Sequence, residues 1–277
     1  MGRHGIEHPP DVDAALDRLV PRLDLGPIRW RHPDVAREIY RPSVEQALGA
    51  TRPGQRVLDA GSGLGSVARA LALAGREVVA IDGDADACTG ARRTLSGTDG
   101  QVVQAWFGPD DGLALGSFDV IRFGRVLHHV VDLAAALDHA LELLIDDGSV
   151  IVEEFAPECI DRCLADWLIM QAAALEAAGE VLDDPPSDAA AFLDDWQVKI
   201  ARMQLISAAT VRSALDERFA LGDVYWQGGI WADIAKRVVA PDRAGVIAHR
   251  MAEAEDGAVR AGQLPGVVMR LVGHRHD

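Results

Sequence analysis

Cysteine is scarce in this chain, and long apolar runs are missing. The 277 residues include three cysteines, Cys88, Cys159 and Cys163, an odd number that gives no disulfide framework. Such usage is typical of a reducing compartment, so we expect a cytoplasmic protein. No apolar run approaches the roughly 20 residues that cross a bilayer, and residues 1–13 lack the apolar stretch of a secretory signal. We therefore expect no association with a membrane.

Positive charge is also in short supply. Lys and Arg number 27 against 43 Asp and Glu, which gives a formal net charge of −16. A nucleic-acid backbone or an anionic membrane needs a cationic face, and Lys and Arg form no run here. The charge balance therefore argues against nucleic acid as a partner and favours a small-molecule substrate. With 49% hydrophobic residues, the chain can bury the core of one large domain.

Short β-branched runs alternate with longer helical patterns through the middle of the chain. Strands are predicted at residues 56–60, 77–82, 101–105, 118–123 and 149–154. This alternation predicts an α/β fold with a mostly parallel sheet, right-handed crossovers and helices on both faces.

Four segments follow from this pattern. They are an N-terminal helical cap (1–50), a cofactor-binding core (51–155), a helical insertion after the fifth strand (156–204) and a segment that completes the sheet (205–277). In the last segment, residues 221–226 and 267–273 are predicted as strands. The cap and the insertion either form a lid over the carboxyl edge of the sheet or are ordinary packing helices.

The first predicted strand leads into a glycine-rich loop, Asp59-Ala-Gly-Ser-Gly-Leu-Gly65, and an Ala-rich helix. Gly61, Gly63 and Gly65 allow a sharp turn and a close approach to a ligand, and the helix N-terminus offers free N–H groups. Asp59 would repel a pyrophosphate, and the third glycine of a dinucleotide motif falls on a serine. The loop therefore favours a cofactor with cationic groups and no phosphate, such as S-adenosylmethionine (SAM), over NAD.

Asp82 adds to this interpretation. It ends the second predicted strand, where a carboxylate can accept hydrogen bonds from both ribose hydroxyls of a nucleoside. NAD-binding and SAM-binding sheets share this feature, so Asp82 selects SAM only in combination with the loop.

Three further motifs carry a resemblance to a known family. Phe118-Asp-Val-Ile121, Val126-Leu-His-His-Val130 and Asp147-Gly148 resemble the small-molecule branch of the class I SAM-dependent methyltransferases, over residues 50–155. The resemblance implies a Rossmann-like, seven-stranded sheet, with SAM as cofactor and S-adenosylhomocysteine as product. It places Asp59 and Gly61 beside the methionine end of SAM, and Asp82 on the ribose. The other cofactor contacts that we expect are Gly63, Gly65, Gly83, Gly124 and Arg125.

The chain departs from the family after the third strand, where an acidic residue usually bonds the adenine amino group. The segment here is Val103-Gln-Ala-Trp-Phe107, which has no acid. The amide oxygen of Gln104 can accept the same bond, and Trp106 can stack on the adenine ring. We therefore include both among the cofactor-binding candidates.

Titratable residues cluster near the expected reacting centre. His128 and His129 can remove a proton from an acceptor, although a helix-start histidine can also bond the backbone. Glu153 and Glu154 end the fifth strand, and strand alternation directs only one of them to a given layer. We take His128, His129 and Glu154 as catalytic candidates and expect no metal. Arg122, inside a buried strand, must either pair with an acid, for which Asp119 and Asp59 are candidates, or point into the pocket at the end of the strand.

The aromatic residues allow both structural and binding roles. Trp167 and Trp196 lie on apolar helix faces and are expected in the core, whereas Trp226 and Trp231 suit a pocket for a flat substrate. In the family, the segment that holds Trp30 and Tyr40 here often closes over the SAM carboxylate.

The whole pattern predicts transfer of a methyl group from SAM to an oxygen, nitrogen or carbon atom of a metabolite. A SAM-binding enzyme with non-methylating chemistry, such as a cyclisation, is the main alternative, because a fold does not dictate a reaction. A non-catalytic scaffold is a weaker one. N-terminal helices often dimerise in such enzymes, so a homodimer is a candidate assembly.

Overall fold

The computed structural model describes residues 11–23, 32–109 and 115–276. Eight strands form one mixed sheet. They are β1 (Arg56–Ala60), β2 (Glu77–Asp82), β3 (Gln101–Gln104), β4 (Phe118–Gly124), β5 (Leu144–Phe155), β6 (Phe219–Leu221), β7 (Tyr225–Gln227) and β8 (Val268–Arg275). The strand order is β3-β2-β1-β4-β5-β8-β6, and β7 pairs with β8 beside this path. The predicted seven-stranded, mostly parallel sheet is confirmed, with β7 as a short eighth strand.

The direction of the strands fixes where a ligand can bind. Strands β1 to β5 pair in parallel, whereas β8 runs antiparallel to β5, β6 and β7. From β1 the chain proceeds outward to β2 and β3 and then returns to β4 on the other side of β1. Ligands of such sheets bind at the carboxyl ends of the strands beside this switch point.

Ten α-helices surround the sheet in the described part of the chain. They are α1 (Val12–Leu19), α2 (Pro33–Gly49), α3 (Ser66–Leu73), α4 (Ala85–Leu95), α5 (Leu133–Leu143), α6 (Arg162–Ala177), α7 (Ala189–Met203), α8 (Ala208–Asp216), α9 (Trp231–Ala235) and α10 (Pro241–Arg260). Six of them begin at an Asp or Ser whose side chain accepts the amide hydrogen three residues further on. These caps satisfy donors that the first helical turn leaves free.

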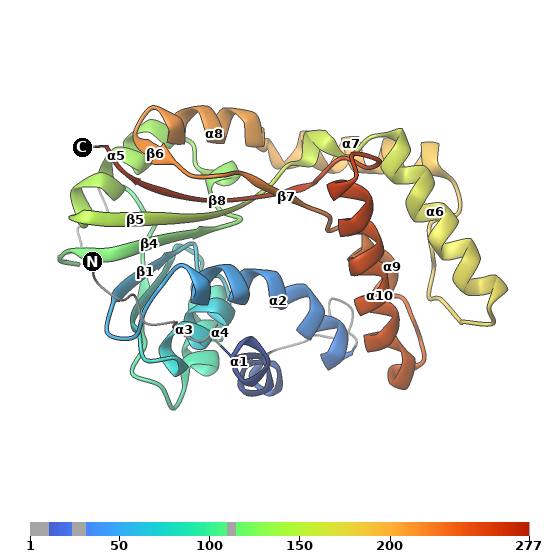
Figure 1. Ribbon diagram of the computed structural model, residues 1–277, viewed down its shortest axis with the longest axis horizontal. Coiled ribbons are helices and arrows are strands. Elements are labelled where there is room, and N and C mark those ends of the chain that lie inside the picture. The colour runs from blue at the N-terminus through green and yellow to red at the C-terminus, as the bar shows by residue number, and fades with distance from the viewer. Residues whose placement is uncertain (1–10, 24–31, 110–114, 277) are drawn as a thin grey trace, which may run out of the picture.

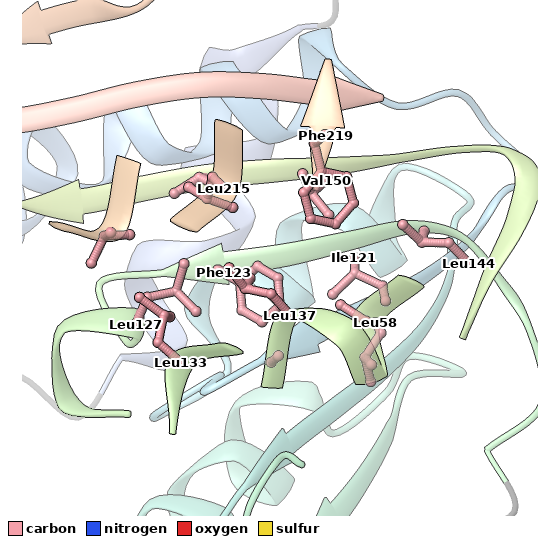
Figure 2. Close-up of a cluster of buried hydrophobic side chains, with 14 of the residues drawn as sticks. Leu58, Ile121, Phe123, Leu127, Leu133, Leu137, Leu144, Val150, Leu215 and Phe219 are labelled. Carbon is pink, nitrogen blue, oxygen red and sulfur yellow. The ribbon is translucent and has the colours of Figure 1, made fainter. Parts of the chain in front are cut away.

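Alternation along the strands divides the core into two layers. Leu58 and Ile121 lie in one layer with Leu137 of α5, and Figure 2 shows these side chains together. Val57 and Val120, one residue earlier on the same strands, lie in the other layer with α1, α2 and α3. Both faces of the central strands are therefore buried, as expected of a parallel sheet.

A third apolar cluster lies outside these layers. It joins α6 to α9 and α10, with Leu168, Ile234 and Met251 among its buried residues. Figure 1 shows α6, α7, α9 and α10 grouped at the end of the molecule opposite α5 and β6. No helix in the described ranges is both long enough and apolar enough to cross a membrane.

Three details differ from the sequence-based expectation. The strand predicted at 221–226 is two short strands, β6 and β7, because residues 222–224 leave the ladder after Gly222 donates to the Val272 carbonyl. The strand predicted at 149–154 begins earlier, at Leu144, since α5 ends at Leu143 and β5 starts at once, so Gly148 lies inside the strand. Helix α10 had no counterpart among the predicted elements.

Candidate active site

A cleft of about 950 Å³ lies at the carboxyl ends of β1, β2 and β4. Its wall includes residues 61–64 of the glycine loop, Asp82, Trp106, Arg125 and His129. Helix α2 closes one side with Ile39, Tyr40 and Ser43. We call it the glycine-loop cleft. The N-terminal helical segment thus contributes to it, whereas α6 and α7 pack against α9 and α10 instead.

The glycine loop needs its glycines for two different reasons. Gly61 has φ of +69°, and a Cβ there would lie 2.3 Å from Val126 Cγ2. Gly65 has φ of +73° immediately before α3, and a Cβ there would lie 2.5 Å from Leu95 of α4. Gly61 therefore shapes the cleft floor, while Gly65 lies behind it and lets α3 pack closely on α4.

Asp82 holds the glycine loop in place. Its Oδ2 accepts the Gly63 amide at 2.8 Å, and its Oδ1 accepts the Asp84 amide at 2.9 Å. Each carboxylate oxygen has a further lone pair, so the side chain can still accept hydrogen bonds from a ligand in the cleft.

Trp106 lies at the open edge of the cleft. The indole is 78% exposed, and a Cβ on Gly83 would lie 2.2 Å from the ring, so the side chain rests on Gly83. A large exposed ring supported from behind offers a flat surface for stacking. Gln104 pairs with Asp82 in the ladder but is exposed on the edge strand and does not line the cleft.

A buried charge cluster forms the floor on the β4 side. Arg122 donates to Asp59 at 2.7 Å and lies 3.4 Å from Glu153. Glu153 also pairs with Arg125 at 2.7 Å and with Arg270 of β8 at 3.0 Å. Three guanidinium groups therefore face two carboxylates.

These contacts set the protonation of the two acids. Burial raises the pKa of Asp59, an effect that the charge of Arg122 partly offsets. Burial also opposes ionisation of Glu153, but Arg125, Arg270 and Arg122 outweigh it and hold the pKa far below its usual range. Three guanidinium groups against two carboxyl groups leave at least one net positive charge beside the cleft.

Gly124 and Arg125 bring this charge to the surface. A Cβ on Gly124 would lie 2.3 Å from the Arg122 guanidinium, so the position has no room for a side chain. Arg125 has φ of +56°, and its amide donates to the Glu153 carbonyl at 2.6 Å. Its side chain is 44% exposed, which leaves part of the guanidinium free to meet an anion in the cleft.

The two histidines take different positions. His128 is buried, and its Nδ1 pairs with Glu154, which is fully buried and also accepts the Phe155 amide at 2.9 Å. His129 lines the cleft, and its ring centroid lies 4.1 Å from that of His128. Burial, then the charge of His128, lowers the pKa of His129. A neutral imidazole therefore faces the cleft near pH 7, where it can accept a proton.

The structure brings about half of the predicted site residues to the cleft wall. Those on the wall are Gly61, Gly63, Asp82, Trp106, Gly124, Arg125 and His129. Asp59, Gly65, Gly83, Gln104, His128 and Glu154 do not line it. All but Glu154 contact a residue that does, and Glu154 holds His128. Arg122 has the partner Asp59 that the sequence suggested, whereas Asp119, the other candidate, accepts the Arg56 amide.

One residue of the charge cluster, Arg270, was not predicted from the sequence. Arg270 lies within the apolar strand β8 and joins the charge cluster. Its signal in the sequence is the same as that of Arg122, a charge inside a buried strand.

Trp30 lies outside the described residues. Trp226 and Trp231 do not line one common pocket. Trp231 is buried, and Trp226 lines a separate surface cavity beside α8. No group of three potential metal ligands is gathered within the described ranges.

The sheet order and the cleft define a class of protein, the Rossmann-like α/β proteins that bind a nucleoside cofactor at the switch point. A family model described as a methyltransferase domain matches residues 30–218, which is more than half of the chain. The chain belongs to this family, the class I SAM-dependent methyltransferases, and the resemblance inferred from its motifs is confirmed.

Individual relatives agree with this assignment. An uncharacterized 37.1 kDa protein in a Streptomyces fradiae transposon is 32% identical over 198 residues, covering 69% of this chain and 50% of that protein. A demethylmenaquinone methyltransferase of Clavibacter sepedonicus is 29% identical, covering 53% and 56%. The chain thus spans about half the length of these two relatives. A demethylmenaquinone methyltransferase of Parafrankia sp. is 28% identical, covering 88% and 97%.

Solved structures share the fold. The N-methyltransferase NodS of Bradyrhizobium japonicum, in complex with S-adenosylhomocysteine, has a TM-score of 0.53 at 14% identity and covers 96% of this chain and 99% of its own. A SAM-dependent methyltransferase of Mesorhizobium loti has a TM-score of 0.52 at 18% identity, covering 86% and 98%. At these identities the likeness concerns the fold alone.

Proposed function

We propose that this protein transfers the methyl group of SAM to an oxygen, nitrogen or carbon atom of a small molecule. The observation that carries the proposal is the glycine-loop cleft, which combines a hydroxyl-binding end at Asp82 with an anion-binding end at Arg125. When bound, SAM supplies an electrophilic methyl group on a sulfonium. Relatives named demethylmenaquinone methyltransferase support a small-molecule acceptor.

The nucleoside end would lie between Asp82 and Trp106. Asp82 keeps acceptor capacity after its two bonds to backbone amides, which suits a pair of ribose hydroxyls. Trp106 offers its exposed face to a purine. Gln104 lies opposite Asp82 in the ladder, at the same end of the cleft. It would bond the adenine amino group only after its side chain turns toward the purine.

The amino-acid end would lie over the buried charge cluster. One net positive charge and the free part of the Arg125 guanidinium suit the carboxylate of the methionine moiety. Asp59 acts there through Arg122, which it holds by a 2.7 Å ion pair. The glycines at 61 and 63 keep the wall open for a closely bound ligand.

Proton removal from the acceptor would fall to His129. It is the histidine on the cleft wall, and its lowered pKa keeps it neutral near pH 7. His128, fixed by Glu154, packs against its ring and limits its rotation. In this arrangement Glu154 and His128 are positioning residues, and alignment of the reactants supplies most of the rate.

Calorimetric titration with SAM, S-adenosylhomocysteine and NAD tests the cofactor assignment. We expect micromolar binding of the two sulfur nucleosides and none of NAD. Asp82→Ala should weaken SAM binding by about 1–3 kcal/mol through the loss of charged hydrogen bonds. Asp146→Ala is the matched control, because Asp146 is an exposed acid near the start of β5, at the opposite edge of the sheet.

Three results would contradict the proposal. Binding of NAD alone would show that the loop serves a dinucleotide. Equal losses of SAM affinity in Asp82→Ala and Asp146→Ala would show that Asp82 does not face the cofactor. SAM binding without formation of S-adenosylhomocysteine, across a panel of acceptors that bind, would favour the non-methylating alternative.

A further inference from the structure

A second cavity, of about 430 Å³, lies beyond the end of β5. Phe155 forms its wall on the sheet side, Phe192 and Trp196 come from α7, and Ile230 precedes α9. Its lining is therefore mainly apolar, with two aromatic rings from α7 opposite the C-terminal helices. It shares no lining residue with the glycine-loop cleft.

Two lysines stand out on the wall of this cavity. The sequence contains only Lys199 and Lys236, while all its other Lys-or-Arg residues are arginine, and both lysines line the cavity. They come from different elements, since Lys199 lies in α7 and Lys236 follows α9. We call this space the lysine cavity.

The charges on the wall do not cancel. Lys236 pairs with Asp233, which also lines the cavity, whereas Lys199 forms no ion pair with any residue of the described ranges. Two ammonium groups and one carboxylate leave one net positive charge, in a chain whose formal net charge is −16. A compact cation on a flexible stem beside apolar walls suits a ligand with both an apolar body and an anionic group.

Aromatic contacts lie between the lysine cavity and the cleft. The ring of Trp196 packs edge-on against Phe155 with centroids 5.7 Å apart, and Phe155 meets His128 at 6.5 Å. His128 in turn contacts His129 on the cleft wall at 4.1 Å. One row of packed rings thus lies between the lysine cavity and the imidazole of His129, and it separates the cavity from the glycine-loop cleft.

We propose that the lysine cavity is a binding site for a ring-containing, apolar molecule with one anionic group. The ring system would lie against Phe155 and Trp196, and the anion would meet Lys199 and Lys236. The site is separate from the glycine-loop cleft, so its preference for an anion can be measured without methyl transfer.

A matched pair of probes tests the preference. 2-Naphthoate and 2-naphthamide have nearly the same shape and differ in charge, and calorimetry gives the affinity of each. We expect the wild-type protein to bind 2-naphthoate about tenfold more tightly, the gain of one partly exposed charge-assisted contact. In Lys199→Gln/Lys236→Gln this preference should disappear, with the affinity for 2-naphthamide unchanged.

Two controls locate the effect. Arg202→Gln removes an exposed cation from the same helix, three residues beyond Lys199, and should keep the preference. Ala232→Trp fills the cavity and should abolish binding of both probes, with circular dichroism confirming the fold. Both probes should bind together with SAM, because the two spaces share no wall residue.

The outcomes separate this inference from the proposed function. Equal affinity for the two probes, a preference that survives the double substitution, or competition with SAM would overturn the inference. Failure of SAM to bind the wild-type protein, with the naphthoate preference intact, would overturn the methyltransferase proposal and leave this inference in place. The anion preference of the lysine cavity would then stand alone.

Discussion

The glycine-loop cleft and the lysine cavity handle charge in opposite ways. In the cleft, Arg122 and Glu153 are buried on neighbouring strands, and their charges are met by other strand residues. In the cavity, Lys199 and Lys236 come from helical segments and lie against apolar walls. A strand ladder holds its side chains at fixed spacing, whereas helices that pack on one another can vary without disturbing the sheet. The strands therefore fix the charges beside the cleft, whereas the helices set the charges on the wall of the lysine cavity.

The largest effect is expected from breaking the buried cluster. Arg122→Met should lower the free energy of unfolding by about 3–5 kcal/mol, because Asp59 would remain buried without its charge partner. Urea denaturation measures the change. Arg162→Met removes an arginine whose ion pair with Asp166 is exposed, and it should cost less than about 1 kcal/mol.

A double substitution sharpens this prediction. Asp59→Asn/Arg122→Met removes both members of the pair and should recover much of the stability that Arg122→Met loses. If the double variant were as unstable as the single one, lost packing of the arginine stem, and not an unpaired charge, would be the cause.

Among the helices, Glu255 offers the next test, with a somewhat smaller expected change in the free energy of unfolding. This buried residue of α10 accepts the amides of Gly229, Ile230 and Trp231, next to the lysine cavity. Burial raises its pKa from 4.5 to about 7. The folded state therefore holds a proton that the unfolded state releases between these values, so stability from this group is present below pH 4.5 and is lost as pH rises to about 7.

Comparison with a neutral variant isolates this contribution. Between pH 5 and pH 8 the free energy of unfolding of Glu255→Gln should rise relative to wild type by up to about 3 kcal/mol. Denaturant titrations at several pH values measure it. Glu253→Gln, on the same helix but half-exposed, should show no such trend, and a parallel trend in both variants would contradict the role of Glu255.

The same contrast explains what the sequence could predict. Strands β1 and β2 match their predicted bounds, because buried β-branched runs there end at the glycine loop and at Asp82. Helix α10 went unpredicted because its buried positions, Ala244, Ala248, Met251 and Glu255, hold small residues and an acid where an apolar stripe is expected.

Within the site, two buried ion pairs join residues opposite one another in the ladder, but only the one at Arg122 could be anticipated from the sequence. Arg122 lies opposite Asp59 in the β1–β4 register, and the chemistry of a buried charge already required a partner of this kind. Arg270 lies opposite Glu153 in the β5–β8 register. That pairing depends on how β8 returns to the sheet after α10, and no local pattern in the sequence encodes it.

The smallest effect concerns the row of rings between the two spaces. His128→Asn keeps an amide that can donate to Glu154 but removes the charge that lowers the pKa of His129. The pKa of His129 should therefore rise, although burial, the larger cause, will keep it below its usual value. Titration of the imidazole by NMR measures this shift, and His139→Asn, on α5, serves as the control. An unchanged His129 pKa would mean that His128 positions its neighbour by packing alone, and the link from Glu154 to the cleft would then be steric instead of electrostatic.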